Sequence, residues 1–213
     1  MRTDELIVAL SRQPDAIDPR IPLRRLLFAS VFGVGAALPL MLWRLGINPD
    51  LASDALTAMF WVKWGFAATV AAASAALVFR LARPGIDTRR AAQAVALPLV
   101  ALWGLAAFVL LAASPAERLP LTMGSSWDSC PFNIAMLSLP ALILLLAAVR
   151  SLAPTRLRWA GAATGLLAGA LGALVYVLHC PELEAPFIAV WYVLGMLIPA
   201  GLGALVGPRT LRW

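Results

Sequence analysis

Charged residues are scarce in this chain: 13% of its 213 residues are Asp, Glu, Lys or Arg, whereas 62% are hydrophobic. That composition lies outside the usual range of soluble globular domains. Six apolar stretches are long enough, or nearly so, to cross a hydrocarbon core that requires about 20 helical residues. They lie at about 26–45, 58–79, 91–113, 132–149, 159–178 and 187–206. The sequence therefore predicts an all-α membrane protein, a bundle of six transmembrane helices.

Ionisable side chains are nearly absent from the predicted spans. Lys63 is the only candidate, and it lies close enough to the outer end for its amine to snorkel to the headgroup region. Proton relays and ion pathways usually depend on carboxylates or histidines inside the membrane. Their absence here disfavours a pump, a channel or a small metal-uptake transporter.

A cleavable signal peptide is also not evident. The first apolar run begins near Leu26, behind a charged segment, and is long enough to span the membrane itself. We therefore expect two parts: a cytoplasmic N-terminal segment, residues 1–24, and a membrane domain, residues 25–213.

Basic residues are distributed very unequally between the two predicted sides. Fourteen arginines lie in the N-terminal segment, the second and fourth loops and the C-terminal tail. The opposite side has only Arg44, Lys63 and Arg118. The positive-inside rule then places both termini in the cytoplasm, in the inner membrane if the source is a bacterium. Short basic loops facing anionic lipid also explain the high pI, so we expect no direct nucleic-acid binding.

The N-terminal segment contains a short amphipathic pattern. Thr3 can cap a helix that begins at Asp4, and Leu6, Ile7 and Leu10 fall on one face at a 3.6-residue period. A helix of about ten residues is marginal by itself in water. We therefore expect it to dock on the membrane surface, on the protein's own loops or on a soluble partner.

Small residues recur in the fifth predicted span. Gly161, Gly165 and Gly169 form a small-xxx-small series that Gly172 continues. Such a face lets a neighbouring helix approach closely. We expect the fifth helix to be central to the bundle.

The chain has only two cysteines and one histidine. Cys130 opens the fourth predicted span and Cys180 closes the fifth. A short inner loop, residues 150–158, joins these spans, so they should pack as an antiparallel pair whose outer ends meet. A disulfide needs Cα atoms about 4.4–6.8 Å apart, which this arrangement permits. Because both cysteines lie next to proline-broken helix ends, we predict that both are accessible to water.

Three interpretations of this cysteine pair remain open. It is a permanent structural disulfide, a redox or thiol-reactive switch, or a soft-metal site completed by His179 with Glu182 or Asp128 as further ligands. Thiolate and imidazole suit copper(I), zinc or cadmium. The spacing matches no established zinc motif, and a lone interfacial histidine is more often a capping residue than a ligand.

Several stretches of the chain resemble the NrsF-like family of bacterial membrane anti-sigma factors. The stretches run from Met1 to Ile7, over Cys130 before the fourth span, and from His179 through Cys180-Pro181-Glu182 into Pro186-Phe187 and Trp191–Met196. The resemblance covers essentially the whole chain, and the paired cysteines with the His-Cys-Pro-Glu stretch are its more specific part.

The resemblance implies a six-helix inner-membrane protein that is not an enzyme and that holds an extracytoplasmic-function sigma factor until stress arrives. The N-terminal helix (Asp4, Leu6, Ile7, Leu10) would contact the sigma factor. Cys130 and Cys180 would sense periplasmic metal or oxidative stress. The main alternative is a membrane thiol oxidoreductase, although that class normally uses a Cys-x-x-Cys motif and two cysteine pairs.

Overall fold

The computed structural model describes residues 3, 5, 20–83 and 85–212, and all regular structure within them is helical. Six helices are long and apolar enough to cross a membrane: α2 (Ile21–Arg44), α4 (Ala58–Leu81), α5 (Arg89–Ala112), α7 (Cys130–Arg150), α8 (Leu157–Tyr176) and a sixth span, Ala185–Thr210. Each coincides with a predicted span, and the ends differ by at most five residues. The six predicted spans are thus confirmed as helices of membrane-spanning length.

The sixth span is not one uniform helix. It consists of a short turn, α9 (Ala185–Phe187), then a π-helical turn, η1 (Ile188–Tyr192), then α10 (Val193–Thr210). Single π turns inside helices often occur at functional sites because they change the direction in which nearby side chains point. Here the π turn ends at Tyr192, a fully buried residue.

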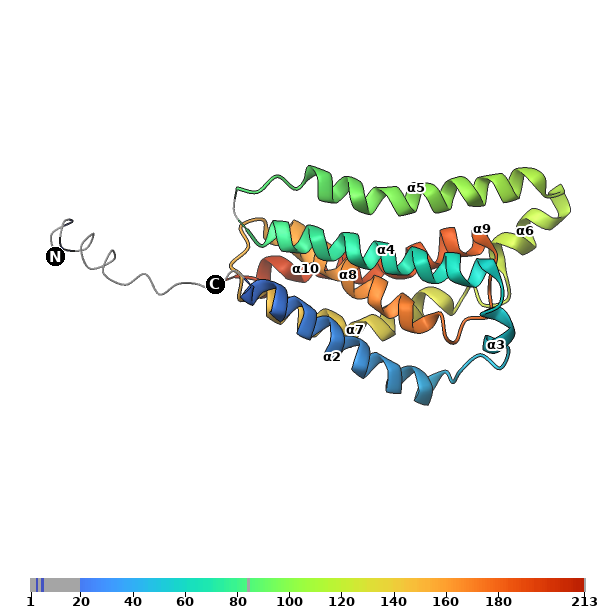
Figure 1. Cartoon of the computed structure of the whole chain (residues 1–213), viewed down its shortest axis with the longest axis horizontal. Helices are drawn as coiled ribbons and strands as arrows, with labels where there is room; N and C mark the ends of the chain where they lie inside the picture. The colour runs from blue at the N-terminus through green and yellow to red at the C-terminus, as the bar shows by residue number, and fades with distance from the viewer. Residues whose placement is uncertain (1–2, 4, 6–19, 84, 213) are drawn as a thin grey trace.

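Within the described residues from 20 onward, two short helices lie outside the spans. They are α3 (Leu51–Asp54), between α2 and α4, and α6 (Pro115–Met123), between α5 and α7. Helix α6 begins with a capping box in which the Glu117 carboxylate accepts from the backbone N–H and the hydroxyl of Ser114. Figure 1 shows both short helices at the same end of the bundle.

Helix α8 is the centre of the bundle, as its glycines predict. In the most apolar stretch of α8, 72% of the residues are buried, whereas 17% are buried in the corresponding stretch of the peripheral α5. The backbones of α8 and α10 approach so closely that a Cβ on Gly161 or Gly165 would collide with carbonyl oxygens of α10. Gly172 instead faces Ile134 and Ser138 of α7. The small-residue face is therefore a packing surface, since larger side chains would separate these helices.

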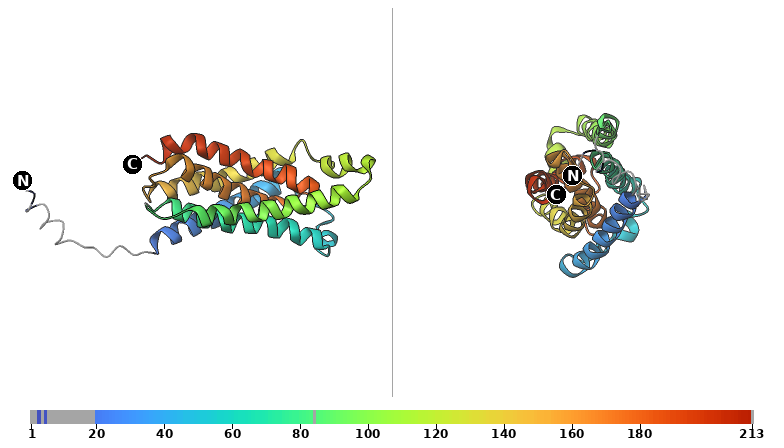
Figure 2. Two further views of the ribbon diagram at one scale, coloured as in Figure 1. Left: turned by 90° about the horizontal axis from the view of Figure 1, so that it is seen from above. Right: turned by 90° about the vertical axis from the view of Figure 1, so that its left-hand side faces the viewer.

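The bundle is elongated, with helix ends gathered at both of its ends (Figures 1 and 2), and the two ends differ in composition. We call one the arginine end; it is formed by the ends of α2, α4, α5, α7, α8 and α10 that carry Arg20, Arg24, Arg25, Arg80, Arg83, Arg89, Arg90, Arg150, Arg156, Arg158, Arg209 and Arg212. The other is the cysteine end, where Cys130 starts α7 and Cys180 follows α8. Between them, large apolar side chains such as Leu97 and Phe108 are exposed on the outer faces of the helices, as expected where lipid is the solvent.

Candidate functional site

The structure brings the two cysteines together at the cysteine end. Cys130 is the first residue of α7, and Cys180 lies four positions beyond the last residue of α8. Their side chains interact with each other, and both are free cysteines. The antiparallel packing of α7 on α8 explains this, because a short turn joins them at the opposite end.

The prediction that both cysteines are accessible to water is wrong. Cys130 is 0% exposed and Cys180 is 2% exposed. Pro131 lies in the first turn of α7 and Pro181 lies in the non-helical stretch between α8 and α9, yet both neighbouring cysteines are buried. A reagent from solution therefore reaches the sulfurs only after local opening of this end.

Lys63 points into this same cluster. It lies on α4, is 0% exposed, and its ammonium donates to the carbonyl oxygens of Cys180 at 2.7 Å and Glu182 at 2.8 Å. Its side chain also interacts with the Cys180 sulfur and, more weakly, with Cys130. The expectation that Lys63 snorkels to water is thus wrong: its amine lies at the cysteine end, but backbone carbonyls satisfy it there instead of solvent.

Two tyrosines complete the cluster. Tyr192, placed by the π turn, has its ring 5.1 Å from the Lys63 ammonium, a cation–π contact. Tyr176, at the end of α8, packs its ring 5.8 Å from that of Tyr192 and interacts with the Cys130 thiol. The Tyr192 hydroxyl interacts with the Cys180 sulfur and makes no hydrogen bond to a nitrogen or oxygen among the described residues.

Sequence reasoning did not assign Lys63, Tyr176 or Tyr192 to the site, although a signal was present. The cluster holds the chain's only lysine, both of its tyrosines and both of its cysteines. Apart from the arginines, the cluster therefore contains every side chain of the sequence whose ordinary pKa lies above neutral pH. These three residues could have been identified from two features together: each belongs to a residue type that is rare in this chain, and each lies within a predicted span.

The cluster lowers the pKa of the Cys180 thiol to about 6. The hydrogen bond with Cys130 is the largest cause and the Lys63 ammonium adds to it, while burial opposes both. Two thiols that share a hydrogen bond release their first proton as a unit. We therefore describe the pair as one thiol, Cys130, donating to one thiolate, Cys180, beside a buried cation.

The segment between α6 and α7 is fastened over this end. The Glu182 carboxylate accepts from the backbone N–H of Ser125 at 2.7 Å and from its hydroxyl at 2.6 Å. The Trp191 indole donates to the carbonyl oxygen of Thr122 at 2.9 Å. Gly124 has φ +57°, and a Cβ there would lie 2.7 Å from atoms of Glu182. Glycine is required because this turn combines a left-handed φ with close contact.

The further metal ligands that the sequence suggested are not gathered around the sulfurs. Glu182 is bound to Ser125, Asp128 is exposed, and His179 pairs its Nδ1 with the carbonyl oxygen of Gly46 at 3.1 Å. The His179 ring also contacts Tyr176, with 5.5 Å between ring centroids. Within the described part of the chain, no group of three or more His, Cys, Asp or Glu side chains could hold a metal ion.

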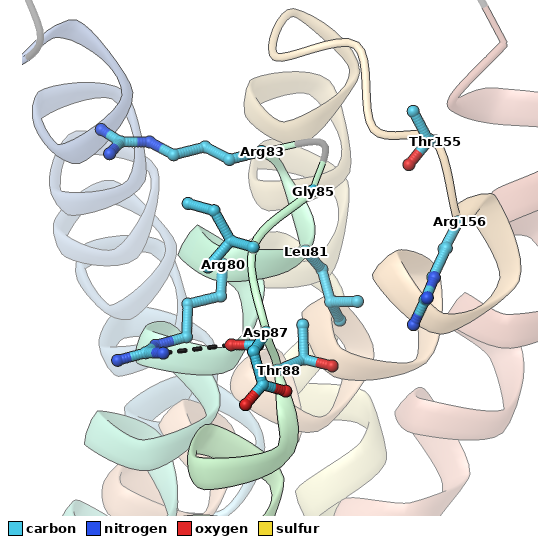
Figure 3. Close-up of a pocket in the computed structure, with 9 residues that line it drawn as sticks. Arg80, Leu81, Arg83, Gly85, Asp87, Thr88, Thr155 and Arg156 are labelled. Carbon is cyan, nitrogen blue, oxygen red and sulfur yellow. Dashed lines mark hydrogen bonds between the residues drawn. The ribbon is translucent and has the colours of Figure 1, made fainter.

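The arginine end contains a separate polar pocket of about 260 Å³, between the α4–α5 loop and the start of α8. Arg80 donates to the carbonyl oxygen of Asp87 at 3.1 Å, and Arg83 lies over the ring of Phe79. Figure 3 shows Arg83 and Arg156 on opposite sides of the pocket, with their guanidinium groups pointing apart. The pocket is basic, but its cations do not converge on one point.

The residues expected to contact a sigma factor, Asp4, Leu6, Ile7 and Leu10, lie outside the described residues. The site that the structure does show is therefore the cluster at the cysteine end. A thiol and a thiolate in direct contact can be joined by a two-electron oxidation or bridged by a thiophilic reagent. Burial makes either reaction dependent on local opening.

Comparison with known proteins gives full-length matches. The model for NrsF, described as negative regulator of sigma F, matches residues 10–213. A protein of Azospira oryzae named probable anti-sigma-F factor NrsF is 48% identical over 213 residues, with both chains covered completely. The anti-sigma-F factor NrsF of Caulobacter vibrioides is 40% identical over 219 aligned positions, again with both chains covered completely. No solved structure gives a significant match. The resemblance found in the sequence is thus confirmed, and this six-helix chain belongs to the NrsF family.

Proposed function

We propose that this protein is a membrane anti-sigma factor that holds an extracytoplasmic-function sigma factor and is not an enzyme. The observation that carries this proposal is the end-to-end similarity, at 48% and 40% identity, to two proteins named as anti-sigma-F factors. A family described as negative regulators supports a binding role rather than turnover of a substrate. The alternative, a thiol oxidoreductase, lacks support because the chain has only one cysteine pair.

We place the arginine end in the cytoplasm of a bacterial cell, with the cysteine end in the periplasm. The concentration of arginines at one end supports this orientation through the positive-inside rule. Six spans return the chain to the side on which it started, so both termini lie with the arginines. The N-terminal segment, residues 1–24, then meets the sigma factor through Asp4, Leu6, Ile7 and Leu10.

We propose that the Cys130–Cys180 pair is the periplasmic sensor and that oxidation to a disulfide is its signal. The direct contact of the two sulfurs supports this step, because little movement is needed to join them. The scarcity of further ligands nearby makes a copper, zinc or cadmium site the less supported signal.

The signal has a direct path to the other end of the bundle. Tyr176 and Cys180 lie at one end of α8, and Arg156 precedes its other end. Because α8 packs backbone against backbone on α10, a shift of one helix cannot be absorbed by side chains alone. Changing a two-state population from 1:99 to 99:1 requires about 5.5 kcal/mol, which a disulfide can supply in part.

The experiment is a reporter assay in which the full-length protein is expressed with its cognate sigma factor. We expect Cys130→Ser and Cys180→Ser each to abolish induction by thiol oxidants while repression persists; Ser129→Ala is the matched control. Induction by copper or cadmium salts alone would favour the metal signal. Unchanged induction in both cysteine variants would remove the sensor role.

The sigma-factor contact has its own matched pair of variants in the same assay. Leu10→Asp places a charge on the apolar face of the N-terminal helix, whereas Val8→Asp places the same charge on the opposite face. We expect constitutive reporter expression for Leu10→Asp and normal repression for Val8→Asp. Equal repression by both variants would exclude this helix face from the contact.

A further inference from the structure

Lys63 is chemically different from every other basic side chain of this protein. The chain has sixteen arginines and a single lysine. Arginine stays protonated under all conditions that proteins tolerate, whereas a buried lysine can lose its proton. Among the lysine and arginine side chains, the one that can discharge is therefore the one that contacts the cysteine cluster.

The surroundings of Lys63 show which negative charge balances it. Two of its three N–H donors bind the carbonyl oxygens of Cys180 and Glu182. The face of the Tyr192 ring and the Cys180 sulfur supply the remaining attraction, and Cys130 contributes more weakly than Cys180. With no solvent contact, the cation depends on these groups alone.

The other titratable groups facing Lys63 do not replace that charge. Tyr176 and Tyr192 are neutral phenols near neutral pH. The Asp54 carboxylate is a weaker and more distant partner of Lys63, and it accepts from the Asn48 amide at 2.7 Å. The Glu182 carboxylate is bound to Ser125. The Cys180 sulfur is thus the principal counter-ion.

We propose that Lys63 is the proton-releasing counter-ion of the cysteine pair: when the two sulfurs join, Lys63 gives up its proton and the buried charge pair disappears. This inference rests on the oxidation of Cys130 and Cys180 proposed above. Lys63 acts here as a positioning residue, because it holds Cys180 as the charged sulfur and then discharges with it.

The step balances in atoms, charge and electrons. Before oxidation the cluster holds the Cys130 thiol, the Cys180 thiolate and the Lys63 ammonium, with zero net charge. Forming the S–S bond releases two electrons to the oxidant and one proton from Cys130. Release of a second proton from Lys63 leaves a disulfide and a neutral amine, again with zero net charge. No uncompensated charge remains in the buried site.

The neutral amine can stay in place. It keeps two N–H donors, which match the two carbonyl oxygens that Lys63 already binds. What is lost is the attraction between α4 and the segment that carries Cys180. Besides α7, which carries Cys130, helix α4 is therefore affected directly by the change, and it carries Arg80 at the arginine end.

Proton counting tests the proposal on the full-length protein in detergent micelles. Ferricyanide accepts electrons without protons, so every proton released into weakly buffered solution comes from the protein. We expect two protons for each disulfide formed in the wild type and one in Lys63→Arg, because an arginine at this position keeps its charge. One proton in the wild type, or failure of the disulfide to form, would overturn the proposal.

A spectroscopic measurement needs no variant. Because the chain has one lysine, protein labelled with 15N at lysine Nζ gives a single side-chain NMR signal. We expect the signal of an ammonium at neutral pH in the reduced protein and of an amine after oxidation by diamide, a two-electron acceptor. An unchanged signal, or an amine already present before oxidation, would contradict the inference.

These results are separable from the proposed function. Neither measurement contains a sigma factor. Lys63 could discharge in a protein that releases no sigma factor, in which case only the anti-sigma proposal fails. Conversely, normal oxidant induction in the reporter assay with an unchanged Lys63 signal would refute this inference alone.

Discussion

The Lys63 ammonium donates to the carbonyl oxygen of Cys180 at 2.7 Å, across 117 positions of the chain. This bond ties α4 to the segment that follows α8 and closes a buried cluster whose other members come from α7, the end of α8 and the π turn of the sixth span. Each of the following expectations depends on that arrangement or on the packing that supports it.

Oxidation should join Cys130 and Cys180 within one molecule. Their side chains already interact with each other at the cysteine end, so the two sulfurs are available to each other for a disulfide. Mass spectrometry of the oxidised protein should show a loss of two hydrogens and a linked peptide pair. A matched control moves one cysteine by two positions, combining Cys130→Ser with Phe132→Cys. Phe132 is 69% exposed on the outside of α7, so no intramolecular link should form.

The charge on Cys180 should appear at unusually low pH. Because its pKa is lowered to about 6, its thiolate should form well below the ordinary value of about 8.5. Ultraviolet absorbance of the thiolate, taken as a difference from Cys180→Ser, measures this titration. Replacing Cys130 by alanine or Lys63 by methionine should raise the midpoint, with the larger effect for Cys130→Ala. A midpoint near the ordinary value in the wild type would contradict the described cluster.

The lowered pKa of Cys180 also determines in which direction the stability of the folded protein changes with pH. A group whose pKa is lower in the folded state stabilises that state above its ordinary pKa, and this contribution is lost as the pH falls through about 6. Reduced wild-type protein should therefore lose more thermal stability on acidification than Cys180→Ser. Equal losses in the two proteins would show that the thiolate contributes nothing.

Loosening the segment over the cluster should expose the sulfurs. Glu182→Gln replaces a carboxylate that holds Ser125 by two hydrogen bonds, each with a net value of about 1 kcal/mol. Labelling of the cysteines by maleimide should become several-fold faster. Glu184→Gln is the matched control, since that exposed carboxylate contacts neither Ser125 nor the cysteines. Identical labelling rates would show that this contact does not limit access.

The glycine face of α8 should tolerate no side chain. In Gly165→Val a Cβ would lie 2.7 Å from the Cα of Ala200 and would meet the carbonyl of Pro199. Overpacking of this kind typically costs about 1–3 kcal/mol, so the melting temperature in detergent should fall. A Cβ at Gly104 in the peripheral α5 would meet no atom within 4 Å outside its own helix turn, so Gly104→Val should leave the melting temperature nearly unchanged.

The proposed orientation can be measured directly in a cysteine-free background. Ser53 at the cysteine end and Ser151 at the arginine end are both exposed. With a membrane-impermeant maleimide on intact spheroplasts, Ser53→Cys should be labelled and Ser151→Cys should be labelled only after lysis. The reverse pattern would invert the assignment of the two ends.

Much of the architecture could be predicted from local patterns. Apolar run length gave the six spans, because a bilayer of fixed thickness demands a fixed helix length. Glycine spacing gave the centrality of α8, because close approach between membrane helices requires small residues. Cys130 and Cys180 were correctly expected at one end, since a short turn forces α7 and α8 to be antiparallel. The first span extends back to Ile21 because Arg24 and Arg25 are good helix formers despite their charge.

The environment of the cysteines could not be predicted in this way. Helix ends in a sequence suggest exposure, yet Cys130 and Cys180 are buried, at an end of the bundle where Glu182 binds Ser125 of the α6–α7 segment. Nothing in the sequence near Lys63 says that its amine turns inward to carbonyl groups more than a hundred positions away. Tyr192 enters the cluster only through a π turn, which has no simple sequence pattern.

The sequence by itself determined that lipid surrounds the protein, how many spans it has and which residue types are available for chemistry, because these depend on composition and local periodicity. The tertiary structure alone decided that the only lysine, both tyrosines and both cysteines share one buried site. That arrangement depends on the packing of α4, α7, α8 and the sixth span around a common end. In a site without water, each side chain's charge is set by these neighbours and not by its position along the chain.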